Sequence, residues 1–197
     1  MSRTLPEQPL SRLWTANYTR AWVANFLLFF SFMIMTPLFP VYLSSAFGAD
    51  KDTIGWVLAG YSITAVLARF VSGWLVDSFP RMVVLVVSYV LFTLCTGAYL
   101  LAGSLLAFAL VRTLHGIPFG ATTVANSTVA VDSLPYSRRA EGIGYYGLSN
   151  NVATALAPSA GLAIYGAWAD FHLLMWVGLV LAVIGVLHRV LNMGRSS

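Results

Sequence analysis

Long runs of apolar residues, separated by short polar segments, fill most of the chain. Segments 53–76 and 104–131 are apolar apart from one arginine each, Arg69 and Arg112. The other long runs contain no aspartate, glutamate, lysine or arginine: 21–49, 82–111, 142–169 and 171–188. Each run reaches or approaches the ~20 residues that an α-helix needs to cross a bilayer. The pattern predicts six membrane helices, at about 21–45, 53–76, 82–102, 104–131, 142–166 and 171–191.

These runs are continuously apolar rather than alternating, which favours helices over a β-barrel. Composition agrees, because 58% of the residues are hydrophobic and 9% are charged, whereas soluble domains have roughly 25% charged residues. We therefore expect an all-α membrane protein whose helical bundle covers residues 21–191. Residues 1–20 are expected to form a cytoplasmic segment before the bundle, and residues 192–197 to begin a cytoplasmic linker or tail.

Charges between the runs predict the orientation of the bundle. If both termini are cytoplasmic, the cytoplasmic side holds eight arginines, and the opposite side holds only Lys51 among three aspartates. The eight are Arg3, Arg12, Arg20, Arg81, Arg138, Arg139, Arg189 and Arg195. Basic residues favour cytoplasmic loops, so we expect both termini in the cytoplasm and the protein in a bacterial inner membrane. This topology accounts for the basic pI, so lipid is the expected environment and no nucleic-acid partner is needed.

Weak internal repetition relates the second predicted helix to the fifth. The second begins Ile54-Gly55-Trp56 and the fifth begins Ile143-Gly144-Tyr145, and Ser72 and Gly161 stand at the same offset from these starts. Membrane transporters often reuse a three-helix unit in inverted orientation. The pairing of helices two and five is what two such units would require.

Polar side chains inside the predicted helices mark candidate positions on a solute path. Arg112 lies about eight residues, or roughly 12 Å, inside its helix, so it should face the bundle interior. His115, one turn further on, is either a proton-path residue or a structural hydrogen-bond partner. The other candidates for the path are Asn25, Asn126, Asn150 and Thr154.

Small and polar residues recur at helical spacing along the fifth predicted helix, at Gly147, Asn150, Thr154, Pro158 and Gly161. For Gly147 and Gly161 we expect close packing against another helix, because small residues let helices approach in membranes. For Asn150 and Thr154, cavity lining and helix packing both stay open.

No enzyme is expected from this sequence. The three histidines, His115, His172 and His188, lie on different predicted helices and form no metal-ligand pattern. No carboxylate stands mid-membrane beside a nucleophile. We therefore expect no catalytic residues, no metal site and no cofactor.

Three short motifs, at residues 73–81, 112–116 and 157–161, resemble elements of the major facilitator superfamily. Gly73-x-Leu75-x-Asp77-x-x-x-Arg81 is similar to its signature loop between helices two and three. The stretch from Arg112 to Gly116 resembles its Arg-x-x-Gln/His-Gly element, and that from Ala157 to Gly161 resembles the Gly-Pro-x-x-Gly element of its exporters. Segments 36–40 and 132–142 are also similar to drug-efflux members. Several positions depart from these patterns: Ser78, Pro80, Met82, Ala157 and Leu162.

The resemblance implies a secondary-active transporter that works by alternating access. The family has twelve helices in two halves, so this chain is expected to be the N-terminal six-helix half, built from two three-helix inverted repeats. Efflux of small molecules or drugs is the expected activity, and coupling to protons is left open. A sugar or metabolite transporter of the same family, and a non-transporting membrane adaptor that retains the fold, remain alternatives.

The resemblance also implies a conformational latch that stabilises the outward-open state, formed by Gly73, Asp77, Arg81 and Asp132. The solute path would include Arg112 and His115, and Pro158 and Gly161 would belong to the exporter motif of helix five. A second six-helix half, or a second copy of the chain, is expected to cover the face that carries Arg112, Asn150 and Thr154.

Overall fold

A computed structural model describes residues 12–191, and within this range every regular element is a helix. The elements are α1 (Ala16–Met33), η1 (Thr36–Leu38), α2 (Phe39–Phe47), α3 (Lys51–Ser78), α4 (Arg81–Ala98), η2 (Tyr99–Leu101), α5 (Leu105–Asp132), η3 (Tyr136–Arg138), α6 (Arg139–Trp168) and α7 (Phe171–Val190). The prediction of an all-α membrane fold is confirmed.

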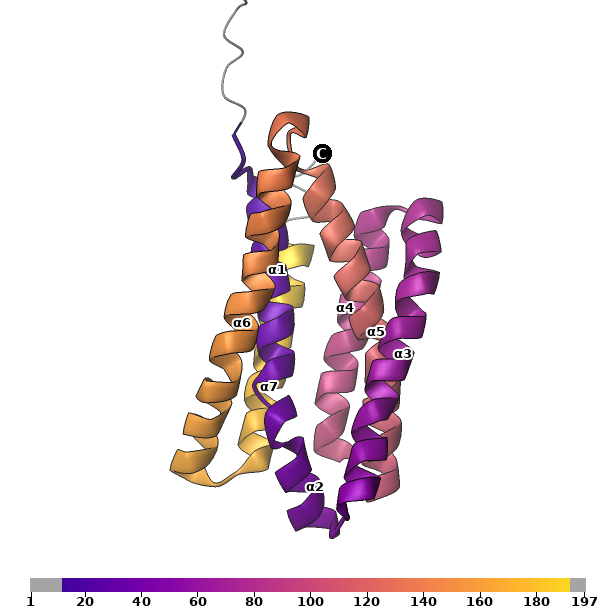
Figure 1. Cartoon of the computed structure of the whole chain (residues 1–197), viewed down its shortest axis with the longest axis vertical. Coiled ribbons are helices and arrows are strands. Elements are labelled where there is room, and N and C mark those ends of the chain that lie inside the picture. Colours follow the sequence, from indigo (N-terminus) through magenta and orange to yellow (C-terminus); the bar gives the residue numbers. More distant parts are fainter. Residues whose placement is uncertain (1–11, 192–197) are drawn as a thin grey trace, which may run out of the picture.

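Five segments of the described chain are long and apolar enough to cross a membrane: Ala16–Phe47, Lys51–Ser78, Arg81–Leu101, Leu105–Asp132 and Phe171–Val190. The remaining predicted span, 142–166, corresponds to α6, a continuous helix of 30 residues, which is about 45 Å long. Its glycine, serine, threonine and asparagine residues lower its hydropathy, so α6 is not among the five. It nevertheless runs the length of the bundle beside α1 (Figure 1).

The first predicted helix, 21–45, is longer and broken in the structure. It begins at Ala16, where the side chain of Thr15 accepts a hydrogen bond from the Tyr18 amide over 3.3 Å. It ends at Met33, and the chain continues through η1 into α2. A proline stands in the first turn of each of these two short elements, where the missing N–H group costs no helical hydrogen bond. The prolines therefore account for the position of the break.

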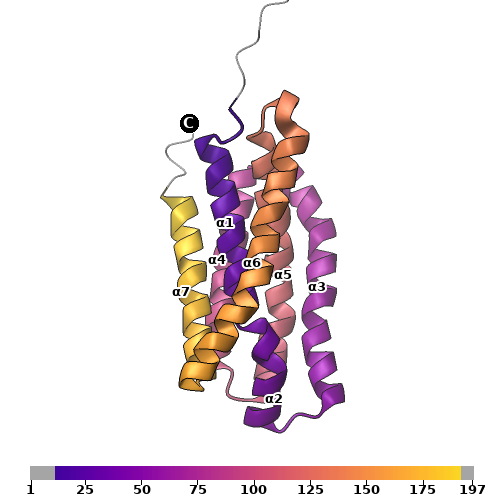
Figure 2. The same ribbon diagram turned by 60° about the vertical axis from the view of Figure 1, so that its left-hand side comes forward.

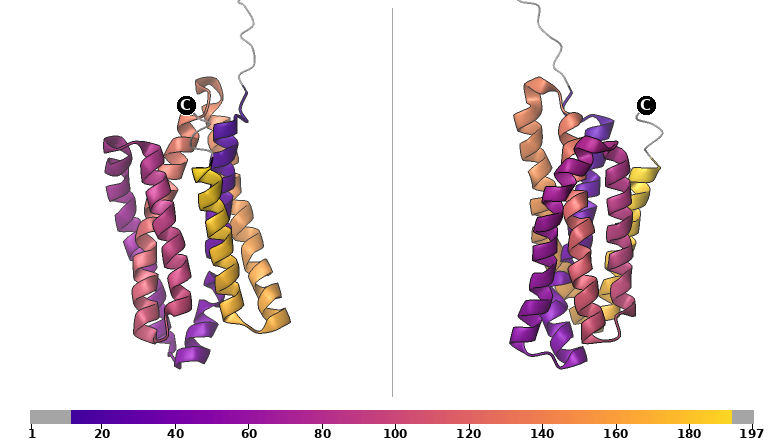
Figure 3. Two further views of the ribbon diagram at one scale, coloured as in Figure 1. Left: turned by 180° about the vertical axis from the view of Figure 1, so that it is seen from behind. Right: turned by 90° about the vertical axis from the view of Figure 1, so that its right-hand side faces the viewer.

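The long helices form two groups of three. One group contains α1, α6 and α7, and the other contains α3, α4 and α5 (Figures 1 and 3). Within the groups, α1 packs on α6 and α7, and α5 packs on α3 and α4. Contacts of α4 with α7 and of α1 with α5 join the groups. The α1 and α5 helices are therefore the central elements of the bundle.

The pairing of the helices has the symmetry expected of two three-helix repeats. Exchanging α1 with α5, α3 with α6 and α4 with α7 converts the α3–α5 pair into α6–α1, and the α4–α5 pair into α7–α1. The α4–α7 and α1–α5 pairs are each converted into themselves. Each spatial group therefore takes helices from both repeats, which interlocks the two repeats in one bundle.

Both ends of the described chain lie at the same end of the bundle, here called the terminal end (Figure 2). The α3–α4 and α5–α6 connections also lie there, with Arg81, Arg138 and Arg139. The opposite, distal end holds the α2–α3, η2–α5 and α6–α7 connections, with Lys51 and three aspartates, Asp50, Asp52 and Asp170. The basic residues thus gather at one end of the bundle.

Candidate functional site

Arg112 is buried two turns after the start of α5, with 3% of its surface exposed. Its Cζ atom lies 4.9 Å from the ring centre of Phe32, 5.2 Å from that of Phe39 and 4.4 Å from that of Tyr61. These three rings, from α1, α2 and α3, are here called the aromatic box. They stabilise the cation through their π faces, but the Nε and Nη1 groups of Arg112 have no hydrogen-bond partner. The box therefore holds a positive charge whose hydrogen-bonding capacity is only partly used.

His115 is fully buried beside the aromatic box. Its Nδ1 atom lies 3.0 Å from the Tyr99 hydroxyl, and its Nε2 atom lies 3.4 Å from the Thr96 hydroxyl. The imidazole also contacts the Phe92 ring, with ring centres 4.7 Å apart. Both ring nitrogens are engaged with residues of α4 and η2, so this arrangement favours the structural interpretation of His115 over the proton path.

Asn126 lies at the centre of a buried network near the terminal end. Its amide donates to the Ala21 carbonyl over 2.9 Å and is 2.8 Å from the Tyr146 hydroxyl. Its Oδ1 atom accepts a hydrogen bond from Arg189 Nη2 over 2.9 Å. The network joins α1, α5, α6 and α7, so Asn126 ties helices together rather than lining an open path.

The sequence counts Arg189 among the arginines on the cytoplasmic side, but the structure buries its side chain. Arg189 belongs to the last turn of α7 and only 3% of its surface is exposed. Hydropathy could not indicate that the side chain turns inward, because a basic residue near a helix end equally fits the interface. A local signal is Gly185, one turn earlier, where a Cβ atom would collide with the Tyr89 hydroxyl. Arg195 lies outside the described residues.

The buried face of α6 is formed by Gly142, Ser149, Ala153, Ala157 and Gly161. Ser149 Oγ accepts a hydrogen bond from Asn25 Nδ2 over 2.8 Å. Gly161 packs as predicted, because a Cβ atom there would collide with the Ile34 carbonyl. At Gly147 no neighbour packs closely within the described bundle, since a Cβ atom would meet nothing within 4 Å.

The adjacent face of α6 carries the predicted lining residues. Asn150 is half-buried and Thr154 is exposed, and Thr154 Oγ1 donates to Asn150 Oδ1 over 3.1 Å. Pro158 is half-buried one turn further on. These side chains contact one another rather than a neighbouring helix, so they remain available to a solute or a second helical unit.

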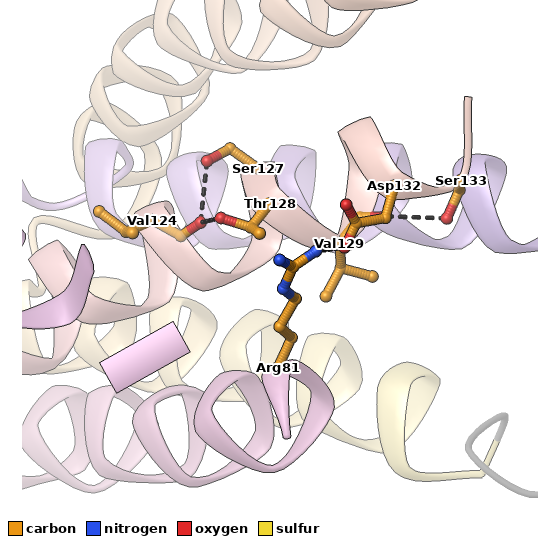
Figure 4. Close-up of polar contacts among 7 residues, drawn as sticks. All are labelled: Arg81, Val124, Ser127, Thr128, Val129, Asp132 and Ser133. Atoms are coloured by element: carbon orange, nitrogen blue, oxygen red, sulfur yellow. Dashed lines mark hydrogen bonds and ion pairs between the residues drawn. The ribbon is translucent and has the colours of Figure 1, made fainter. Parts of the chain in front are cut away.

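The predicted latch is partly assembled. Arg81, at the start of α4, forms an ion pair with Asp132, the last residue of α5 (Figure 4). A shallow pocket of about 260 Å³ adjoins the pair and is also lined by Ser127, Thr128 and Val131. Asp77 is exposed near the end of α3, and Gly73 is half-buried one turn before it. Asp77 forms no ion pair with Arg81, although its charge lies near enough to act on the Arg81 guanidinium.

A second ion pair stands at the terminal end, beside the α5–α6 connection. Arg138 donates from Nε and Nη2 to the two carboxylate oxygens of Glu141, over 2.8 and 2.7 Å. This hydrogen bonding lowers the pKa of Glu141 below its ordinary value. Glu141 lies in the first turn of α6, where the helix dipole favours a negative charge.

Residues 21–193 match the family model described as Major Facilitator Superfamily. The chain belongs to the major facilitator superfamily. The family match agrees with the resemblance of residues 73–81 and 112–116 to the signatures of this family. The bundle is a half of the family's transporter fold. Membership of this family supports a membrane transporter of the same type.

Known proteins resemble the chain over part of their length. An uncharacterised MFS-type transporter of Bacillus subtilis (strain 168), YqjV, is 26% identical over 148 residues, which is 66% of this chain and 36% of that protein. A mutant of the peptide transporter POT in complex with sulfate has a TM-score of 0.81 at 19% identity, covering 89% of this chain and 37% of that one. The human organic anion transporter MFSD10 has a TM-score of 0.72 at 17% identity, covering 92% and 47%. The chain thus spans less than half the length of each of these proteins.

Proposed function

We propose that the chain is the N-terminal half of a secondary-active transporter that exports small molecules by alternating access. The observation that carries the proposal is the buried Arg112 in its aromatic box. An ionisable residue deep in a membrane bundle is costly and marks a solute or ion path by default. Family membership supports a transporter, and the exporter-like motif around Pro158 and Gly161 supports the direction of transport.

We place the solute path along the face that carries Arg112, Asn150 and Thr154. A second six-helix unit would cover this face, since α3 and α6 flank it and leave many apolar side chains exposed. His115 and Asn126 are assigned supporting positions because their polar groups are bonded inside the bundle. If export is proton-coupled, the titrating carboxylate would come from the second unit, since the described helices of this chain carry acidic residues only near their ends.

The export proposal is tested by supplying the missing helices. We expect cells that make this chain together with a C-terminal half to extrude at least one of three probes: ethidium, fluorescein or a fluorescent glucose analogue. Either half alone, and the pair carrying Arg112→Ala, should not extrude it, with expression matched by immunoblot. Equal extrusion by the Arg112→Ala pair would show that the proposed path is wrong.

Orientation is a second proposal, with the terminal end of the bundle in the cytoplasm. It is supported by the gathering of Arg81, Arg138 and Arg139 at that end. In a background with Cys95→Ala, we expect an impermeant maleimide to label Gly103→Cys in intact cells and not Tyr136→Cys. Both positions are exposed, so detergent-permeabilised cells provide the matched control. Labelling of Tyr136→Cys in intact cells would invert the topology.

We further propose that Asp77, together with the Arg81–Asp132 pair, holds the transporter outward-open. Asp77 is exposed at the terminal end and is free to meet the positive N-terminus of a helix in the second unit. We expect Asp77→Asn to speed maleimide labelling of Thr154→Cys in inverted vesicles that contain both halves, again with Cys95→Ala. Asp52→Asn, which makes the same chemical change at the distal end, should leave the rate unchanged. Equal rates in both variants would contradict the latch.

A further inference from the structure

Carboxylates in the described helices stand only at the helix ends, whereas two arginines are buried inside the bundle. All its acidic residues lie within the first or last turn of a helix or cap one: Asp50, Asp52, Asp77, Asp132, Glu141 and Asp170. Two arginines, Arg112 and Arg189, are buried with 3% exposure each. Neither forms an ion pair within residues 12–191. The interior therefore attracts anions and repels cations.

The two buried arginines differ in what their guanidinium groups contact. Arg189 donates to the Asn126 carboxamide, which is itself held by Ala21 and Tyr146. Arg112 rests on three aromatic rings and interacts with the Tyr99 hydroxyl, but its Nε and Nη1 groups are without an acceptor. Aromatic faces stabilise the charge but do not accept these N–H groups at full strength. Arg189 has one group without a partner, Nε, whereas Arg112 has two, so Arg112 has the greater capacity left for an acceptor.

Two rings of the aromatic box come from opposite sides of the break in the first membrane segment. Phe32 is the penultimate residue of α1 and Phe39 is the first residue of α2, with η1 between them. A change in the angle between α1 and α2 would therefore move one ring relative to the other and uncover the guanidinium. The third ring, Tyr61 on α3, belongs to the other group of helices. Such an opening would not require any helix to unfold.

We propose that the solute handled by this transporter carries a carboxylate, which Arg112 binds when the aromatic box opens. The proposal rests on the proposed transport function and specifies its substrate class. A carboxylate would accept charge-assisted hydrogen bonds from the guanidinium, which are roughly twice as strong as neutral ones. A cationic solute would meet two buried positive charges and no counter-charge from this half. The same guanidinium could instead receive a carboxylate side chain from the second six-helix unit, and the experiment distinguishes these sources.

The test uses three probes with one scaffold: benzoate, benzamide and benzylamine. Thermal unfolding of the purified chain is measured in detergent at increasing probe concentration, because a ligand of the folded state raises the midpoint. We expect benzoate alone to raise it. Arg112→Gln should weaken the benzoate affinity about 10- to 100-fold, the range expected for charged hydrogen bonds. Arg112→Lys should retain part of the affinity, and Arg69→Gln, which changes an exposed arginine, should retain all of it.

Three outcomes would overturn the proposal. The first is equal stabilisation by all three probes, and the second is an unchanged benzoate effect in Arg112→Gln. The third is loss of benzoate binding when the C-terminal half is added, which would assign the carboxylate to the protein. The unliganded midpoints of the variants show whether each one is folded, and Arg112→Lys keeps the charge if Arg112→Gln fails to fold.

Failure of this inference can be separated from failure of the transport proposal. Anion-selective binding without extrusion of any probe by the paired halves would leave the inference standing and contradict transport. Extrusion of the cation ethidium by the paired halves, with no effect of benzoate on the unfolding midpoint, would support transport and contradict the carboxylate inference.

Discussion

Asn126→Leu is expected to lower the free energy of unfolding by about 3 kcal/mol. The substitution removes the Oδ1 acceptor that lies 2.9 Å from Arg189 Nη2. The guanidinium is 3% exposed and its Nε group already lacks a partner, so it would remain buried with no acceptor from Asn126. The Ala21 carbonyl and the Tyr146 hydroxyl would lose their contacts with the amide at the same time. The measurement is the midpoint and slope of SDS-induced unfolding in mixed micelles.

A double variant shows whether the cost comes from the stranded charge. Asn126→Leu combined with Arg189→Leu removes donor and acceptor together, and it should be more stable than Asn126→Leu alone, since an apolar pair of similar shape carries no desolvation penalty. Asn150→Leu is the matched control, because Asn150 is half-buried and bonded only to Thr154. It should change stability by less than about 0.5 kcal/mol. If the two single effects simply add in the double variant, Arg189 and Asn126 are not coupled.

Gly116→Val should be strongly destabilising, costing about 3 kcal/mol or more. A Cβ atom at Gly116 would overlap the Thr64 hydroxyl and the Tyr61 carbonyl, and would stand 2.9 Å from the Ala65 amide nitrogen. Two of these three atoms belong to the α3 backbone, so side-chain rotation cannot relieve the overlap. The α3 and α5 helices would have to separate, and Arg112 and Tyr61 lie on either side of that contact.

Gly144→Val is the control for intrinsic helix preference. Gly144 lies within α6, and a Cβ atom there would meet nothing within 4 Å. Valine is a slightly better helix former than glycine, so this variant should be as stable as the parent chain or more stable. The comparison uses the same SDS-unfolding midpoint. Equal losses in Gly116→Val and Gly144→Val would mean that the α3–α5 approach does not limit stability.

Much of the fold is determined by local features of the sequence. Continuous apolar runs between short polar segments predict membrane helices, because backbone groups must be satisfied within each segment inside a bilayer. The runs predicted the α3, α4, α5 and α7 helices and the α6 helix, whose bounds differ by a few residues from expectation. The motif residues predicted the family, and burial of Arg112 followed from its depth alone. These inferences depend on residues that are close together in the chain.

What only the tertiary structure decided is which neighbour each polar side chain meets. Asn126 was placed on a solute path, but its amide reaches Ala21, 105 residues away in sequence. Arg189 was counted on the cytoplasmic side, but it turns inward to Asn126. Arg81 forms its ion pair with Asp132 and none with Asp77. The break in the first helix places Phe32 and Phe39 around Arg112 from two directions. Helical periodicity indicates which residues share a face of a helix. It does not indicate which helix lies opposite that face, because this depends on packing between segments far apart in the chain. Small residues such as Gly116 and Gly161 allow the close approach of those segments.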